Sequence, residues 1–250
     1  MPVQAVALLL NLRFAARFPV VYHRLCCRIF GISIDRRGTI SAARPTLFAS
    51  NHTSYLDIMV LGALMPVSFV AKTEVGSWPL FGWLAKLQRT VFVDRQRRSA
   101  RDQRDDITRR LAASDSLMLF PEGTSNDGNR VLPFRSALFG AAERRLGPGG
   151  TAGPVTVQPV SIAYTRLDGV PVGYTLRPLF AWYGDMEMAG HLWQVAGLGR
   201  ITVVVEFHPP TSIAAFASRK ELAEHCRRQV MAGVAAALAG RRPQPSAAPS

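Results

Sequence analysis

From Thr46 onward, short apolar runs alternate with longer stretches of helical character, and this alternation limits the possible folds most strongly. Strands are predicted at 46–50, 67–71, 90–94, 116–120, 155–164, 175–183 and 201–207, and helices at 54–65, 78–87, 97–113, 136–145 and 218–238. With 250 residues, 48% of them hydrophobic, the chain is long enough for one sizeable core. We therefore predict one α/β domain with a mostly parallel central sheet flanked by helices.

The first 34 residues have a different pattern, in which four arginines interrupt an apolar stretch. The arginines lie at spacings of 4, 7 and 4, near one face of a helix: Arg13, Arg17, Arg24 and Arg28. A helix lying in the lipid headgroup region has this pattern, and so does a core-packed helix with a solvated arginine face. The longest uncharged run is too short to cross a bilayer of roughly 30 Å.

The chain thus divides into three predicted parts. Residues 1–34 are expected to form a helical membrane-associating segment, residues 35–240 the α/β domain, and residues 241–250 a disordered tail. The predicted helix 218–238 begins with a capping box and carries an apolar stripe that we assign to core packing, formed by Leu222, Cys226, Val230 and Val234.

The net charge and the cysteine and histidine contents limit which partners, compartments and metal sites are expected. The net charge of +13 attracts polyanions such as nucleic acid, an anionic bilayer or phosphorylated ligands. The sequence has no zinc-finger spacing, RNA-recognition signature or helix-turn-helix, so we expect no nucleic-acid partner. Three cysteines argue against a disulfide framework and for a reducing compartment. The five histidines are scattered without H-E-x-x-H, so no metal site is expected.

The stretch "SNHTSYLD" after the first predicted strand contains His52 and Asp57. Ser54 and Asp57 can form a capping box that starts a helix, with His52 as an ordinary loop residue. Alternatively, Asp57 in the first helical turn reaches back to one imidazole nitrogen and stabilises the imidazolium that forms when the other nitrogen takes a proton. These eight residues alone leave both interpretations open.

The stretch "LFPEGTSNDGNRVLPF" places Glu122 and Gly123 at the end of a predicted strand, where ligands collect in open α/β sheets. Gly123 lets a ligand approach the backbone closely. Arg130 and Arg135 follow in a loop whose guanidinium groups suit phosphate, although solvated charges on a surface turn are the common alternative.

Four ordered stretches resemble the motif blocks of the lysophospholipid acyltransferase family, which includes the 1-acylglycerol-3-phosphate acyltransferases. They are "NHTSYLD", "FVDR", "FPEGTS" and "VQPVSI", and "FVAKTEVGSWPLFGWLAKLQ" also resembles the family's segment between the first two blocks. The resemblance extends from Thr46 to about Thr165. It implies an O-acyltransferase that moves a fatty acyl group from a thioester to the free hydroxyl of a lysophospholipid.

The resemblance also implies roles for individual residues. His52 would remove the proton from the acceptor hydroxyl, and Asp57 would orient and charge-balance its imidazole. Glu122 and Gly123, in a block that continues with Thr124, would bind the acceptor. Arg95 would bind the glycerol phosphate. Independently of the family, the basic residues of these stretches are candidates for headgroup or donor phosphates: Lys72, Arg89, Arg130 and Arg135.

The family's chemistry implies the partners as well. The donor substrate would be a thioester of coenzyme A or acyl carrier protein (acyl-CoA or acyl-ACP), with no bound cofactor. Membrane lipids would supply the lysophospholipid acceptor. We therefore expect a peripheral or monotopic protein of the inner (cytoplasmic) membrane, with its active site facing the cytoplasm.

The acceptor is the open point. The third block often continues E-G-T-R in this family, whereas this chain has Ser125 at the arginine position. The leading expectation is 1-acyl-sn-glycerol-3-phosphate, giving phosphatidic acid. The run "EGTSNDGNRVLPFRSALFGAA" also resembles the subgroup that acylates lyso-ornithine lipid, which has no glycerol phosphate. A non-catalytic basic protein that binds membranes is a further alternative.

Overall fold

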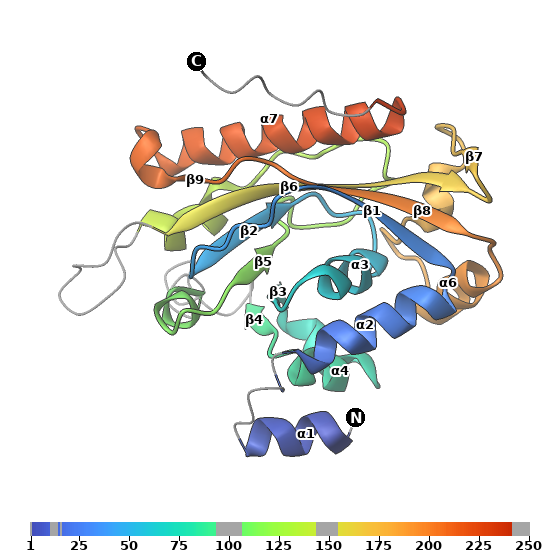
Figure 1. Ribbon diagram of the computed structural model, residues 1–250, viewed down its shortest axis with the longest axis horizontal. Helices are drawn as coiled ribbons and strands as arrows, with labels where there is room; N and C mark the ends of the chain where they lie inside the picture. Colours follow the sequence, from blue (N-terminus) through green and yellow to red (C-terminus); the bar gives the residue numbers. More distant parts are fainter. Residues whose placement is uncertain (1, 11–14, 16, 94–106, 144–154, 242–250) are drawn as a thin grey trace.

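The computed structural model describes residues 2–10, 15, 17–93, 107–143 and 155–241. Their centre is a sheet in the order β1-β8-β6-β2-β5-β3-β4 (Figure 1). The strands are β1 (Ile32–Gly38), β2 (Thr46–Ser50), β3 (Ser68–Lys72), β4 (Val91–Val93), β5 (Leu117–Leu119), β6 (Thr156–Leu167) and β8 (Ile201–Phe207). The short β7 (Val170–Pro171) and β9 (Thr211–Ser212) pair with β6.

The pairing is parallel except where β6 meets β7, β8 and β9. All five residues of β2 are buried, as expected for a central strand covered on both faces. Because β2, β3, β4 and β5 run in the same direction, the segments after them leave at the same edge of the sheet. The predicted α/β domain with a mostly parallel sheet is confirmed.

Helices cover both faces of this sheet. In Figure 1, α7 (Arg219–Leu238) lies across one face, while α3 (Leu56–Leu64) lies against the other with α2 (Phe18–Ile29) outside it. Further helical elements are α1 (Pro2–Leu9), α4 (Phe81–Leu87), α6 (Met188–Ala196) and the 3-10 helices η2 (Thr73–Ser77), η3 (Ser136–Glu143), η5 (Arg177–Phe180) and η6 (Ile213–Ala215), and residues 107–112 are helical as well.

Side chains alternate between the two faces of the sheet along each strand, and they form two apolar clusters, one on each face. In β2, Leu47 and Ala49 join the cluster under α7, whereas Phe48 joins the cluster under α3. The apolar stripe predicted on α7 is buried in the first cluster. Ser218 is the N-cap of α7, as predicted, and its Oγ accepts a hydrogen bond from the Glu221 N–H at 3.3 Å. The returning bond of the capping box differs, because the Glu221 carboxylate accepts the Ala217 N–H at 3.2 Å.

Several predicted elements differ in the structure. The strand predicted at 175–183 is wrong, because this segment contains η5 and irregular backbone. Pro178 explains the difference, since proline has no N–H for a sheet and suits the first turn of a helix. The helix predicted at 136–145 is the 3-10 helix η3, and most of the helix predicted at 97–113 lies outside the described residues.

The N-terminal region joins the fold more closely than the sequence indicated. The predicted division between residues 34 and 35 falls inside β1, which the sequence analysis did not identify. Along α2, Val20, His23 and Cys27 are buried on the side facing α3. Within the described part of the chain, no helix is both long enough and apolar enough to cross a bilayer.

The contact between α2 and α3 depends on Gly62, which leaves room for the ring of His23. A Cβ at position 62 would lie 2.5 Å from His23 Cδ2, and the ring is fixed by a 2.6 Å hydrogen bond between His23 Nε2 and Gln88 Oε1. We predict that Gly62→Ala lowers the free energy of unfolding by about 1–3 kcal/mol, despite the better helix propensity of alanine. Chemical denaturation measures this change. Gly173→Ala is the control because a Cβ there meets nothing within 4 Å, and a Gly62→Ala protein as stable as this control would contradict the prediction.

Candidate active site

The side chains of His52 and Asp57 meet just beyond the carboxyl end of β2. His52 Nδ1 lies 2.9 Å from Asp57 Oδ2. His52 precedes α3 and Asp57 lies in its first turn, so the loop between them lets the carboxylate reach back to the imidazole. The two side chains therefore have the geometry of a base and its orienting acid.

The Asp57 carboxylate is fully buried and accepts further hydrogen bonds. Its Oδ2 accepts the backbone N–H groups of Thr53 at 2.7 Å and Ser54 at 3.0 Å, and its Oδ1 accepts the Tyr164 hydroxyl at 2.8 Å. The bond from the Ser54 N–H is the one that a capping box predicts. Asp57 thus orders the start of α3 and holds His52, so the two interpretations of this stretch are compatible.

These contacts define the state of the imidazole. Because Asp57 Oδ2 is an acceptor for its neighbours, His52 Nδ1 carries a proton and donates it, which leaves a lone pair on Nε2. Across the described chain, Nε2 has no hydrogen-bond partner, and His52 lines a cavity. Phe120 stacks on the ring with a centroid distance of 4.2 Å and limits its rotation. His52 can therefore accept a proton from a molecule in the cavity.

Glu122 supports His52 from the loop after the neighbouring strand, β5. Its Oε1 accepts the His52 N–H at 3.0 Å, and its Oε2 accepts the Leu132 N–H at 3.1 Å and the Asn126 Nδ2–H at 2.7 Å. The carboxylate is buried and does not line the cavity. The expected direct contact between Glu122 and the acceptor is therefore not supported, because its oxygens are engaged inside the protein. Glu122 is a positioning residue.

The cavity beside His52 has a volume of about 520 Å³ and a mainly apolar lining. Gly123 and Thr124 line it next to His52, as the sequence predicted for residues at this edge of the sheet. Its far walls come from α1, α2 and α4. Apolar walls with a few polar groups are typical of a site for a ligand with a hydrocarbon chain.

The structure separates the basic candidates. Lys72 lines the cavity. Arg89 lies at the opposite edge of the sheet, where its Nη2 is 3.0 Å from Asp115 Oδ2 near the start of β5, so its predicted role at the site is not supported. Arg130 and Arg135 are exposed on the loop after Glu122 and do not line the cavity. Arg95 lies outside the described residues.

Ser125, at the position where the family often has arginine, has a structural contact. Its Oγ donates a 2.5 Å hydrogen bond to the carbonyl oxygen of Trp182. The Trp182 N–H donates to the Thr53 carbonyl at 3.0 Å. The segment around Trp182 is thereby attached to both loops of the site, and it forms part of the cavity wall.

Sequence reasoning missed three polar residues that build this site. Tyr164 binds Asp57, and Asn126 binds Glu122. Asn51 connects β2 to β6 through two 2.9 Å hydrogen bonds with the backbone of Ile162. Asn51 belongs to the first motif block and Asn126 directly follows the third, so both could have been noted from the sequence. Tyr164 had no local signal, since its partner is 107 residues away.

A second serine–histidine–carboxylate group lies beneath α7. His208 Nε2 is 3.1 Å from Ser161 Oγ, but its Nδ1 is 3.9 Å from Glu206 Oε1, which is too long for a hydrogen bond. Burial lowers the pKa of His208 to about 4. Gly233 of α7 closes over the group, and neither Ser161 nor His208 lines the His52 cavity. We assign these residues to packing.

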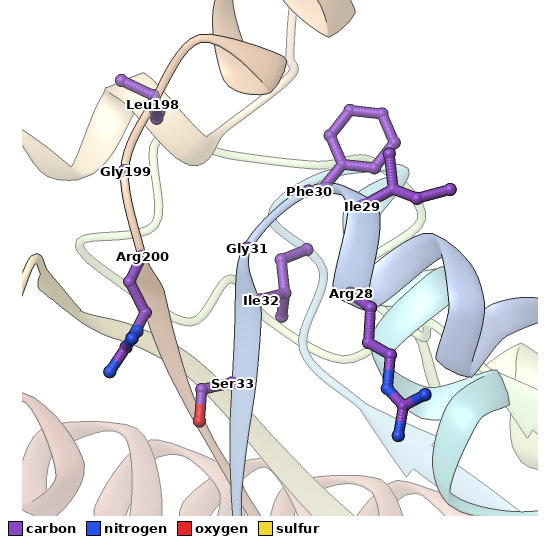
Figure 2. A pocket seen from close by; sticks show the side chains of 9 residues that line it. All are labelled: Arg28, Ile29, Phe30, Gly31, Ile32, Ser33, Leu198, Gly199 and Arg200. Carbon is purple, nitrogen blue, oxygen red and sulfur yellow. The ribbon is translucent and has the colours of Figure 1, made fainter.

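Another cavity, of about 540 Å³, lies between the α2–β1 turn and the start of β8 (Figure 2). It shares Phe30 with the His52 cavity and none of the polar residues of that site. Figure 2 shows the guanidinium groups of Arg28 and Arg200 on opposite sides of β1. The two cations therefore do not converge on one ligand position.

Comparison with known proteins identifies the family. Residues 32–163 match the family model described as Acyltransferase. The lyso-ornithine lipid O-acyltransferase of Brucella abortus is 46% identical over 241 residues, which cover 96% of this chain and 90% of that relative. This chain belongs to the acyltransferase family. The resemblance predicted from the four motif blocks is confirmed.

Two further relatives of this acyltransferase are informative. The 1-acyl-sn-glycerol-3-phosphate acyltransferase of Neisseria gonorrhoeae is 30% identical over 190 residues, covering 76% of this chain and 69% of the relative. The crystal structure of the 1-acyl-sn-glycerophosphate (LPA) acyltransferase PlsC from Thermotoga maritima matches 93% of this chain and 83% of that chain, with a TM-score of 0.64 and 22% identity. This structural match supports the fold of the acyltransferase.

The buried carboxyl of Glu122 gives the acyltransferase a testable pH dependence. Burial raises the pKa of Glu122 from 4.5 to about 7, although the hydrogen bonds it accepts oppose this shift. The folded protein thus binds this proton more tightly than the unfolded chain does. As pH rises from about 4.5 to about 7, the contribution of this group to the free energy of unfolding therefore falls. We predict that the stability of Glu122→Gln relative to wild type increases over this range by up to about 3 kcal/mol.

Urea unfolding of both proteins at pH 5 and pH 8 measures this difference. The variant has no titrating group at position 122, so subtraction removes the titration that the two proteins share. Glu143→Gln is the control because it makes the same substitution at a surface carboxyl, which lies 3.4 Å from Arg219 Nη1. A Glu122→Gln difference that stays flat or falls with pH would show that the Glu122 pKa is not raised.

Proposed function

We propose that this acyltransferase transfers an acyl group from a thioester to the free hydroxyl of lyso-ornithine lipid, producing ornithine lipid. The observation that carries the transfer reaction is the 2.9 Å contact between His52 Nδ1 and Asp57 Oδ2, which engages one ring nitrogen of a side chain that lines the cavity. Acyl transfer to a hydroxyl requires a base at this position. The apolar cavity suits the hydrocarbon chain of a lipid or of the acyl donor.

The chemistry follows from the imidazole and its partner. His52 Nε2 accepts the proton of the acceptor hydroxyl as that oxygen attacks the carbonyl carbon of the thioester. The Asp57 carboxylate stabilises the resulting imidazolium through Nδ1. When the tetrahedral adduct collapses, the carbon–sulfur bond breaks, and the imidazolium returns its proton to the leaving sulfur. Such base catalysis typically contributes about 10² to 10⁴ in rate.

Two observations favour lyso-ornithine lipid over 1-acyl-sn-glycerol-3-phosphate, the leading expectation from the sequence. The Brucella abortus lyso-ornithine lipid O-acyltransferase is 46% identical, against 30% for the Neisseria gonorrhoeae 1-acyl-sn-glycerol-3-phosphate acyltransferase. In addition, Ser125 occupies the position of the frequent family arginine, and its hydroxyl is engaged with the Trp182 carbonyl. This position therefore offers no cation to a phosphate group.

The donor in this proposal is a thioester of coenzyme A or acyl carrier protein. Both carriers present the same thioester carbonyl to the acceptor hydroxyl. The lone pair on His52 Nε2 is sufficient for this reaction, because a thioester is activated enough to react without an enzyme nucleophile. The chain accordingly needs no bound cofactor for the transfer.

A lipid acceptor is reached at a membrane surface, and α2 has an exposed apolar face that can bind to a membrane. Val21, Leu25 and Ile29 repeat at a spacing of four on its outer face, and each is between 55% and 68% exposed. Arg24 and Arg28 lie on the same helix and can meet anionic headgroups. We place the protein peripherally or monotopically on the cytoplasmic face of the inner membrane, with this helix in the headgroup region.

Acyl transfer to separate acceptors tests the reaction. We predict that the purified protein, given acyl-CoA or acyl-ACP, acylates lyso-ornithine lipid with a kcat/KM at least about tenfold above that for 1-acyl-sn-glycerol-3-phosphate. His52→Ala should lose about 10² to 10⁴ in kcat because the base is removed. Faster reaction with the phosphate acceptor would overturn the acceptor assignment. A folded His52→Ala protein with most of its turnover would overturn the base assignment and revive a non-catalytic role.

Sedimentation with vesicles tests the membrane surface. We predict that Leu25→Glu combined with Ile29→Glu lowers binding to vesicles containing anionic lipid at least about tenfold, because two apolar side chains no longer enter the bilayer. The control is Val170→Glu, which adds a charge at a side chain that is 67% exposed on β7. Equal binding by the double variant and the control would contradict this role of α2.

A further inference from the structure

Aromatic rings form one wall of the cavity beside His52. Trp78, Trp182 and Tyr55 all line it. The Trp78 and Trp182 centroids are 5.6 Å apart at an interplanar angle of 81°, and those of Tyr55 and Trp182 are 6.1 Å apart at 66°. Since these rings meet edge to face, they do not cover one another by parallel stacking. Ring faces in this cluster can therefore contact a ligand.

Trp182 is held in place by hydrogen bonds. Its N–H and carbonyl are bound by Thr53 and Ser125, and its indole Nε1–H donates to the Met186 carbonyl at 2.8 Å. Thr53 follows His52 directly, and Ser125 follows the Gly123–Thr124 wall of the cavity. Trp182 is therefore fixed relative to His52, which reduces the entropy lost when a ligand binds.

Two opposite charges complete the wall. Lys72 is the last residue of β3, and Glu74 follows in η2, at the edge of the sheet where β5 leads to Gly123. Both are exposed and line the cavity. Neither side chain has an ion pair or a hydrogen bond with any residue in the described ranges. Among the described residues, one cation and one anion at this wall are thus without a partner inside the protein.

We propose that Trp78, Trp182, Lys72 and Glu74 bind the zwitterionic amino-acid head group of the acceptor. This inference rests on the proposed function and names the residues that recognise the acceptor. Ornithine acylated on one amine keeps a carboxylate and a positively charged second amine. The amine meets the tryptophan faces and Glu74, and the carboxylate meets Lys72. A phosphate monoester would instead be repelled by Glu74 and would gain nothing from the aromatic faces.

Kinetics with each acceptor tests this assignment. We predict that Trp78→Leu, Glu74→Gln and Lys72→Gln each raise the KM for lyso-ornithine lipid about 3- to 30-fold. The KM for the acyl donor and kcat should stay within about twofold, since these side chains do not touch the reacting atoms. Glu74→Lys should also shift the ratio of kcat/KM values toward 1-acyl-sn-glycerol-3-phosphate, because it replaces a repelling charge with an attracting one.

Matched controls come from residues that do not line the cavity. Trp193→Leu removes a tryptophan that is 84% exposed on α6, Lys86→Gln removes a surface lysine of α4, and Glu143→Gln removes a surface glutamate. All three should keep the wild-type KM for lyso-ornithine lipid. These controls separate the loss of the head-group wall, formed by Trp78, Trp182, Lys72 and Glu74, from a general loss of surface charge or aromatic area.

The outcomes distinguish this inference from the proposed function. If wild-type protein fails to acylate lyso-ornithine lipid, the proposed function fails. If wild type acylates it but the cavity variants keep its KM, the head-group wall is wrong while the function stands. Equal increases in KM for both acceptors in Trp78→Leu and Glu74→Gln would also overturn the wall, since these residues would then shape the cavity without recognising the head group.

Discussion

The site depends on the hydrogen bonds that the buried carboxylate of Asp57 accepts. A carboxylate without solvent must be compensated by donors, and Asp57 has the Thr53 and Ser54 N–H groups, the Tyr164 hydroxyl and the His52 imidazole. The first two order the start of α3, the third connects β6, and the fourth is the base in the proposed reaction. Removing the acid would therefore affect the fold of this loop and the state of the base together.

A second acid extends this arrangement across the sheet. Glu122 binds the backbone of His52 from the loop after β5, and Asn126 of the same loop donates to the His52 carbonyl. The strands β2 and β5 are adjacent and parallel, so their loops leave at the same edge although they are about 70 residues apart in sequence. Topology thus brings the first and third motif blocks together. Both acids position the imidazole, and His52 lines the cavity.

The sequence predicted the elements whose signals are local. The apolar runs at 46–50 and 201–207 form strands, and the family resemblance placed His52 beside Asp57. Long-range contacts, such as the one made by Tyr164, have no local signal. The placement of Arg89 was wrong for a reason visible in the sequence. A residue before a parallel strand lies at the opposite edge from residues that follow the strands, so strand direction alone could have excluded it.

Selection between acceptors must come from protein groups that lie away from the reacting atoms. A hydroxyl attacking a thioester needs the same base whether its molecule carries a phosphate or an amino acid, so His52 and Asp57 cannot discriminate between them. Discrimination requires groups that meet the remote head group. In this chain Ser125 supplies no cation and instead fixes Trp182, whose ring adjoins Trp78 in the cavity wall. In the proposed function, the serine at the frequent arginine position offers no cation to a phosphate and, in the same place, anchors an aromatic surface suited to an ammonium group.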